Sequence, residues 1–207
     1  MEFESADPSV VRSIKQRELL NTWLRAVAQH RPLPLPANFQ PDRVADEMVD
    51  MMQYEVVGQG DAARFLITHQ GARLAETYGN ERVDSTAHPH RFLDDAIGPE
   101  RYANVIELYR ACLTHLRPVY SISTVQDSDG KDVSYERLLM PFGRDDAVTQ
   151  IIGSFKSISI EGGFKISNLM GLRPKAEPVI LVRAIIDRAF VPALANAHLP
   201  DEIVELD

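Results

Sequence analysis

The sequence predicts an α+β fold in which strands pair with their neighbours along the chain and helices lie between the strand groups. Two observations indicate this. Residues 53–58 and 64–68 are apolar-rich segments on either side of Gly58-Gln59-Gly60-Asp61, a connection typical of a hairpin. A long amphipathic helix, expected from Gly98, then precedes three further strand-type segments joined by turn sequences. These three segments, expected to form an antiparallel meander, are residues 119–126, 133–142 and 148–160.

A helix is predicted at the N-terminal end, over about residues 8–29, because Asp7-Pro8 is a cap followed by proline at the first helical position. Its apolar stripe follows the i, i+3, i+4, i+7 spacing and consists of Leu20, Trp23, Leu24 and Val27. The alternating prolines of residues 30–36 favour an extended, stiff connector that lays the helix across the domain. A partner that reads proline-rich ligands is the alternative.

Further helices are expected over residues 42–51 and 72–78, the second ending at Gly79-Asn80. The helix from Gly98 has an inward stripe that consists of Val105, Tyr109, Cys112 and Leu116. A C-terminal amphipathic helix is predicted over residues 178–197, with the stripe Val179, Val182, Ile186, Ala189 and Phe190. The expected organisation is an N-terminal helix and connector (1–41), a central domain (42–163) and a C-terminal helical extension (164–207).

Composition and charge exclude several classes of function. The formal net charge is −8 and the pI is about 5.3, which disfavours binding to nucleic acid or to an anionic membrane. The single cysteine excludes an intrachain disulfide, and the acidic N-terminus lacks the regions of a signal peptide. No apolar segment is long enough and free enough of charge to span a bilayer. A cytoplasmic protein is therefore expected.

The order of two strands, short helices, one longer helix and three strands resembles the PAS domain, and several short motifs resemble the bacterial single-domain PAS family. These motifs are Leu19-Leu20-x-x-Trp23, Phe65-Leu66-Ile67-x-x-x-Gly71, Ala75-x-x-Tyr78-Gly79, Tyr109-Arg110-x-Cys112, Arg117-Pro118-Val119-Tyr120 and the strand from Tyr135 to Pro141. The resemblance covers about residues 15–160. It implies a five-stranded antiparallel sheet with helices on one face and a small cavity between them.

Within such a fold, a ligand cavity is expected to be lined by apolar and aromatic side chains with a few polar groups for orientation. The predicted lining consists of Phe65, Ile67, Leu74, Tyr78, Phe92, Val105, Tyr109, Leu113, Ile122 and Leu139. The alternative is that these side chains fill a packed core, because apolar stripes are most often core.

The sequence identifies no particular cofactor, and no metal site or catalytic group is predicted. Cys112 lies late in the long helix without the motif of the flavin-binding PAS relatives, so it is expected to be a buried, inert side chain. Haem is not expected, because Arg101, Tyr102 and Asn104 occupy the turns that carry the proximal histidine in haem-binding relatives. His88 and His90 share a loop, but the sequence indicates no further metal ligand. The protein is expected not to be an enzyme.

Two functions remain open. The first is a sensor that binds a small apolar or amphipathic molecule and signals through its flanking helices. The second is a protein-interaction module, for dimerisation or as an adaptor, with no small-molecule ligand. A homodimer is predicted through Leu20, Trp23, Leu24 and Val27, because this stripe must bury its apolar side chains. The alternative is a monomer in which the stripe folds back on its own sheet.

Overall fold

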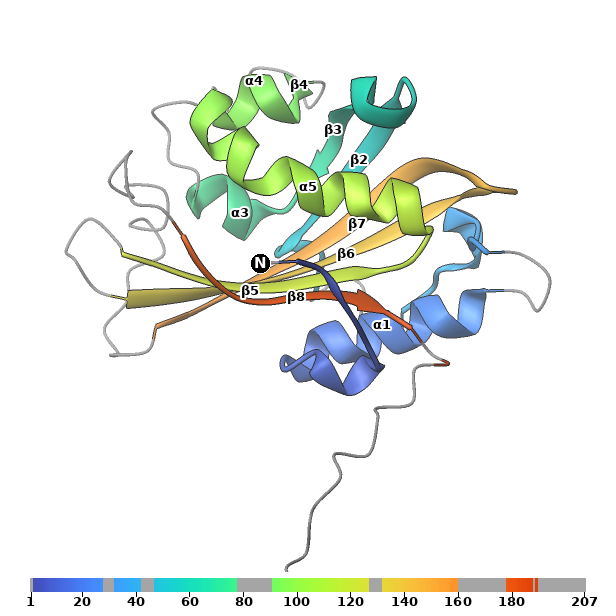
Figure 1. Cartoon of the computed structure of the whole chain (residues 1–207), viewed down its shortest axis with the longest axis horizontal. Coiled ribbons are helices and arrows are strands. Elements are labelled where there is room, and N and C mark those ends of the chain that lie inside the picture. The colour runs from blue at the N-terminus through green and yellow to red at the C-terminus, as the bar shows by residue number, and fades with distance from the viewer. Residues whose placement is uncertain are drawn as a thin grey trace, which may run out of the picture.

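The computed structural model describes residues 2–27, 32–41, 47–77, 91–126, 132–159, 178–187 and 189. They form one eight-stranded mixed sheet with helices on both of its faces (Figure 1). The strands are β1 (Glu4–Ala6), β2 (Met51–Val57), β3 (Arg64–Gln70), β4 (Arg91–Phe92), β5 (Val119–Gln126), β6 (Asp132–Arg144), β7 (Ala147–Ser159) and β8 (Val179–Ile186). The α-helices within the described ranges are α1 (Ile14–Ala26), α3 (Ala72–Thr77), α4 (Leu93–Ile97) and α5 (Pro99–His115). Single 3-10 turns are η1 (Pro8–Val10), η2 (Pro36–Asn38) and η3 (Gly60–Ala62).

The strand order is β1-β8-β5-β6-β7-β2-β3-β4, and every neighbouring pair is antiparallel except β1 and β8. The predicted hairpin is confirmed as the pair β2 and β3, and the predicted meander as β5, β6 and β7. All five strands expected from the sequence are therefore present and lie side by side. The sheet is nevertheless larger than five strands, because β1 and β8 extend it beyond β5 and β4 extends it beyond β3.

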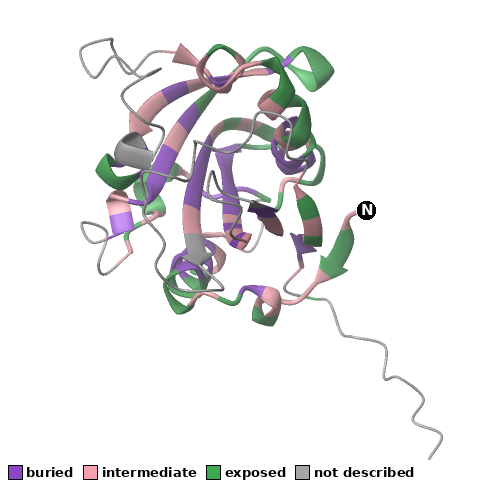
Figure 2. Ribbon diagram, turned by 90° about the vertical axis from the view of Figure 1, so that its left-hand side faces the viewer, coloured by how far each residue is buried: buried purple, intermediate pink, exposed green. Residues whose placement is uncertain are grey.

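The two faces of the sheet have separate cores. We call the face beneath α3, α4 and α5 the inner face and the face beneath α1 the outer face (Figure 1). The buried inner cluster comprises Met52, Tyr54, Phe65, Ile67, Leu74, Leu93, Ile106, Leu108, Tyr109, Ala111, Cys112, Val119, Leu139, Ile151 and Ile185. The buried outer cluster comprises Val11, Leu19, Leu20, Trp23, Met51, Tyr120, Ile122, Leu138, Met140, Phe142, Ile152, Ala184 and Ile186. Figure 2 shows the buried residues along the central strands. Because both faces are covered, these strands carry apolar residues in both alternating sets.

The N-terminal helix is shorter than predicted. Asp7 caps only the single turn η1, through a hydrogen bond from the Ser9 backbone N–H at 2.7 Å, and the chain is extended again at Val11. Ser13 then caps α1 by accepting a hydrogen bond from the Gln16 backbone N–H at 3.4 Å. The stripe that was expected at a dimer interface instead faces the chain's own sheet.

The predicted C-terminal helix over residues 178–197 is wrong in its described part, because Val179–Ile186 form the strand β8. This strand pairs with β5 from Thr124↔Val179 to Val119↔Ile185. Its sequence is rich in β-branched residues, which favour a strand, and its last three residues, Ala184, Ile185 and Ile186, are buried. The extension after Ala189 and residues 164–177 lie outside the described residues, as do residues 42–46 of the predicted short helix.

The described part of the proline connector, residues 32–41, packs along the β6–β7 hairpin. Leu33 is buried, and the Pro34 carbonyl accepts a hydrogen bond from the Gly143 backbone N–H at 3.1 Å. The ring of Phe39 meets that of Phe142 edge-on at 5.2 Å between centroids. The described part of the connector is thus anchored to the sheet.

Candidate functional site

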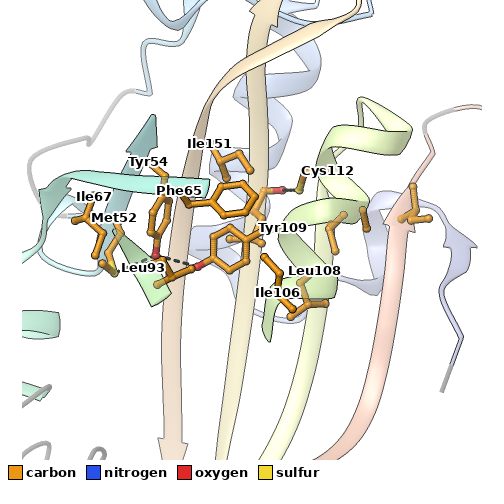
Figure 3. Close-up of a cluster of buried hydrophobic side chains, with 14 of the residues drawn as sticks. Met52, Tyr54, Phe65, Ile67, Leu93, Ile106, Leu108, Tyr109, Cys112 and Ile151 are labelled. Atoms are coloured by element: carbon orange, nitrogen blue, oxygen red, sulfur yellow. Dashed lines mark hydrogen bonds between the residues drawn. The ribbon is translucent and has the colours of Figure 1, made fainter. Parts of the chain in front are cut away.

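The centre of the inner face is a pair of tyrosines whose hydroxyl groups meet under α5. The Tyr109 hydroxyl donates a hydrogen bond to the Tyr54 hydroxyl at 2.9 Å, and the Tyr54 hydroxyl donates to the Met52 sulfur at 3.2 Å (Figure 3). The two rings pack edge-to-face, with their centroids 5.1 Å apart. Phe65 lies against the same ring of Tyr109 at 5.0 Å. Polar oxygen atoms are thereby held within an otherwise apolar cluster.

The sequence places these groups by simple periodicity. Tyr109 and Cys112 lie on the inward stripe of α5 and are buried, as predicted. Met52 and Tyr54 are two positions apart in β2, so the period of two in a strand places both on the inner face. Sequence reasoning missed Tyr54 and Met52, although the apolar alternation of the first hairpin strand could have indicated them.

Most of the predicted ligand-lining residues do come together. Phe65, Ile67, Leu74, Tyr109 and Leu139 belong to the inner cluster, and Val105 and Leu113 are partly buried against it. Three predicted residues differ. Ile122 is a correction, because it lies in the outer cluster on the opposite face. Phe92 lies in the edge strand β4 and is only half-buried, and Tyr78 lies outside the described residues.

Charged residues gather at the β3–β4 end of this face. The Arg64 guanidinium lies 3.8 Å from the centroid of the Phe92 ring and forms ion pairs with Asp94 at 2.8 Å and Asp95 at 3.1 Å. Burial and the nearby Asp94 carboxylate raise the pKa of the Tyr102 hydroxyl. A group of charged residues therefore lies beside the apolar cluster at this end of the face.

Cys112 is fully buried beneath α5, and its thiol lies 3.9 Å from the Leu139 carbonyl oxygen. Burial raises the pKa of the Cys112 thiol. A thiol in this state is a poor nucleophile, which agrees with the inert side chain expected from the sequence.

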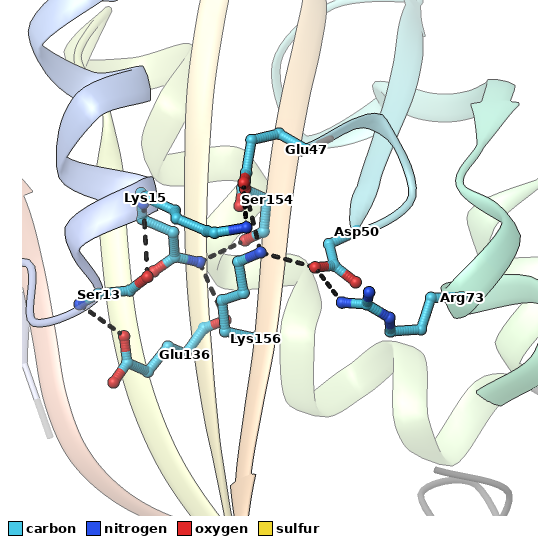
Figure 4. A network of polar contacts seen from close by, with 9 residues as sticks. Ser13, Lys15, Glu47, Asp50, Arg73, Glu136, Ser154 and Lys156 are labelled. Atoms are coloured by element: carbon cyan, nitrogen blue, oxygen red, sulfur yellow. Dashed lines mark hydrogen bonds and ion pairs between the residues drawn. The ribbon is translucent and has the colours of Figure 1, made fainter. Parts of the chain in front are cut away.

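The outer face carries a different kind of site, a set of ion pairs around residues 47–50 that the sequence did not indicate (Figure 4). The Lys156 ammonium, on β7, lies 3.0 Å from Glu47 Oε2 and 2.6 Å from Asp50 Oδ2. The second carboxylate oxygen of Glu47 forms an ion pair with Lys15 of α1 at 2.9 Å, and Asp50 forms one with Arg73 of α3 at 2.7 Å. Residues far apart in the sequence are brought together here, so no local motif could have revealed the cluster.

A hydrogen-bond network lies beside this cluster, beneath the start of α1. The Gln16 side-chain amide donates to the Ser154 carbonyl at 2.9 Å and to the Glu136 carbonyl at 3.4 Å. The Glu136 carboxylate accepts hydrogen bonds from the Tyr120 hydroxyl at 3.0 Å and from the Ser13 backbone N–H at 3.2 Å. These bonds fix both the position and the rotation of α1 on the sheet.

The N-terminal stripe is covered by this packing. Leu20 is 0% exposed and Trp23 is 4% exposed, and the Trp23 indole N–H donates to the Pro141 carbonyl at 2.7 Å. Leu24 and Val27 are partly buried against the outer cluster. The stripe thus folds back on its own sheet, which removes the reason for placing a dimer interface on it.

No family model matches this chain, and no curated protein matches it. Among the described residues, no three His, Cys, Asp or Glu side chains lie close enough together to hold a metal ion. His88 and His90 lie outside these residues. Within the same part of the chain, no helix has the length and apolar character needed to cross a bilayer.

Proposed function

We propose that this chain is a cytoplasmic PAS-type sensory module that binds a small apolar or amphipathic molecule on its inner face and signals through its flanking segments. Two features support the proposal. The five strands expected from the PAS resemblance are contiguous in the order β3-β2-β7-β6-β5. The helices between β3 and β5 in the sequence cover one face of these strands, where the resemblance implies a cavity.

The observation that carries the proposal is the Tyr54–Tyr109 hydroxyl pair inside the inner cluster. Apolar walls provide affinity for a hydrophobic body, and a ligand group that replaces the Tyr109–Tyr54 hydrogen bond can accept a hydrogen bond from a tyrosine hydroxyl or donate one to it. The expected ligand is therefore a small molecule with an apolar body and one hydroxyl, carbonyl or carboxyl group.

Native mass spectrometry of the purified chain tests for a molecule retained from the cell. Thermal unfolding with a panel of aromatic and aliphatic alcohols and carboxylic acids then tests for weaker binding. A ligand at about 100 times its Kd stabilises the folded state by about 2.7 kcal/mol, which should raise the Tm by about 5–10 °C. Absence of both a bound mass and any shift in Tm would contradict the proposal.

Two matched variants locate the binding face. Tyr109→Phe removes the inner hydroxyl, whereas Tyr120→Phe removes a buried hydroxyl from the outer face. The Tm shift caused by the best compound should shrink in Tyr109→Phe and remain in Tyr120→Phe, each measured against its own unliganded Tm. Equal shifts in both variants would place binding elsewhere.

A protein-interaction module without a small-molecule ligand is the second candidate, and one observation favours it. Val179 is 62% exposed and Leu181 is 48% exposed, both on β8. A homodimer or a signalling partner would bury this apolar surface. Light scattering on the full chain and on the double variant Val179→Ser, Leu181→Ser tests the homodimer. A monomeric full chain at micromolar concentration would rule it out, and an unchanged dimer in the variant would move the interface away from β8.

A further inference from the structure

Residues 47–50, two helical residues followed by a two-residue turn, lead into β2, and we call them the 47–50 turn. The backbone of the 47–50 turn is joined both to the inner helix α3 and to the sheet. The Val49 carbonyl accepts a hydrogen bond from the Arg73 backbone N–H at 3.1 Å. The Asp50 carbonyl accepts one from the Phe155 backbone N–H of β7 at 3.0 Å. A movement at the start of α3 therefore acts directly on this turn.

The contact between the turn and the start of α3 is also close. A Cβ atom at Gly71, the residue before α3, would lie 2.3 Å from the Met48 carbonyl oxygen and 2.4 Å from that of Val49. Side-chain atoms cannot relieve this contact, because the opposing atoms belong to the backbone. The turn and the first residues of α3 thus behave as one rigid joint.

The charged side chains continue the connection from this joint to the outer face. In order, Arg73 of α3 binds Asp50, Asp50 and Glu47 share Lys156, and Glu47 binds Lys15 of α1 (Figure 4). The three central side chains are withdrawn from solvent, with 5% exposure for Asp50, 8% for Glu47 and 16% for Lys156. Charge interactions that are shielded from water in this way are stronger than those between exposed residues.

We propose that the 47–50 turn is a coupling device that links the position of α3 on the inner face to the docking of α1 on the outer face. The proposal deepens the proposed function, because a ligand on the inner face would be the agent that displaces α3. When Arg73 leaves Asp50, this buried carboxylate retains Lys156 as its ion-pair partner and draws it away from Glu47. Glu47 and its partner Lys15 are then released, and α1 loosens. In one arrangement Lys156 is shared by Glu47 and Asp50, and in the other it is bound by Asp50 alone.

Trp23 provides a reporter for this event. It is the only tryptophan in the chain, it lies on α1, and it is buried against the outer cluster. Arg73 lies on α3, in the layer on the other side of the sheet (Figure 1). A change at Arg73 that alters the solvent access of Trp23 must therefore be transmitted across the sheet.

The test measures quenching of Trp23 fluorescence by acrylamide in the full chain without added ligand. In Arg73→Gln the quenching constant should rise by about threefold, the size expected when a coupling network shifts the docked population modestly. Arg73→Lys restores a cation beside Asp50 and should return the constant close to that of the wild type. Arg64→Gln is the matched control, because it removes exposed ion pairs on the inner side that do not involve the 47–50 turn.

An unchanged quenching constant in Arg73→Gln would overturn the proposal. An equal rise in Arg64→Gln, or no recovery in Arg73→Lys, would also overturn it, because either result would indicate general loosening. All variants are compared well below their own Tm, so that only folded protein is measured. The quenching test uses no ligand, so a negative result contradicts the coupling but not the proposed binding site on the inner face. A failure to find a ligand contradicts the binding site but not the coupling.

Discussion

The two faces of the sheet are both buried, but they are built from different chemistry. The inner face is held by aliphatic and aromatic side chains, and its central polar contacts are the hydrogen bonds of Tyr109, Tyr54 and Met52. The outer face adds a buried amide network and a set of buried ion pairs to its apolar residues.

This difference indicates that the outer face fixes the position of α1, whereas the packing of the inner face is easier to rearrange. Directional bonds to Gln16 and Glu136 specify one position for α1, and breaking them leaves buried polar groups without partners. The inner face is held mainly by non-directional apolar contacts, which tolerate rearrangement better than a polar network does. The face that can adapt its packing is therefore the better candidate for binding a variable small molecule.

The largest expected effect is on the inner face, in Leu139→Asp. Leu139 is fully buried, and an unpaired carboxylate there should lower the free energy of unfolding by on the order of 4–5 kcal/mol. The sequence predicted an equal loss of soluble folding for Val105→Asp, but Val105 is only partly buried and its carboxylate can turn toward water. In urea unfolding, Leu139→Asp should therefore have a much lower free energy of unfolding than Val105→Asp. Equal decreases in the two variants would contradict the partial burial of Val105.

The second effect concerns the joint between the faces. Gly71→Ala should lower the free energy of unfolding by about 2–3 kcal/mol, because its Cβ would collide with backbone carbonyls of the 47–50 turn. Gly60→Ala is the control. Gly60 has a φ of +56° but no atom within 4 Å of an added Cβ, so the loss should be about 1 kcal/mol. If the two variants unfold at the same urea concentration, the joint is not rigid.

A third comparison uses one hydroxyl from each face. Tyr120→Phe should lower the free energy of unfolding by about 2 kcal/mol, because the buried Glu136 carboxylate and the Arg12 backbone N–H each lose a partner. Tyr109→Phe removes the neutral hydrogen bond to Tyr54 and should lower the free energy of unfolding by about 1 kcal/mol. Chemical denaturation of both variants checks the order. A larger decrease in the free energy of unfolding in Tyr109→Phe would contradict the conclusion that directional hydrogen bonds matter more on the outer face.

The smallest expected effect is the pH dependence that Glu47 contributes. Burial alone would raise the pKa of Glu47, but hydrogen bonds from Lys15 and Lys156 outweigh it and hold the pKa below its ordinary value of 4.5. A lowered pKa means that this carboxylate stabilises the fold above its ordinary value and stops doing so as the pH falls through its folded value. Glu47→Gln should therefore lose less stability than the wild type between about pH 5 and pH 3. Parallel acid profiles for the two proteins would show that Glu47 makes no such contribution.

Much of the fold follows from local patterns. The hairpin, the meander and α5 are specified by turn residues, a proline at the helix start and a clear apolar stripe, all of which are short-range signals. The strand β8 was predicted as a helix because Val179, Val182 and Ile186 fit the helical period as well as a buried strand. This segment forms a strand because it pairs with the edge of β5, which lies far away in the sequence. Local sequence patterns do not reveal such a distant partner.

The candidate site was predictable to a similar degree. Phe65, Tyr109 and Leu139 were identified because they are apolar members of correctly predicted elements. Ile122 was placed on the wrong face, since Tyr120 and Ile122 both pack beneath α1. A strand covered on both sides does not reveal which of its alternating sets faces a ligand. The ion pairs of the 47–50 turn depend on tertiary contacts and had no local signal.

The burial of Cys112 makes its rate of modification by a thiol reagent a measure of opening at the inner face. Its thiol is covered by α5 and has a raised pKa, so a thiol reagent can modify it only during moments when the helix lifts from the sheet. Because the chain has a single cysteine, the modification rate reads one opening event without interference. A molecule that fills the inner face would slow this rate in proportion to its occupancy. The modification rate of Cys112 thus measures how often α5 separates from the inner face of the sheet.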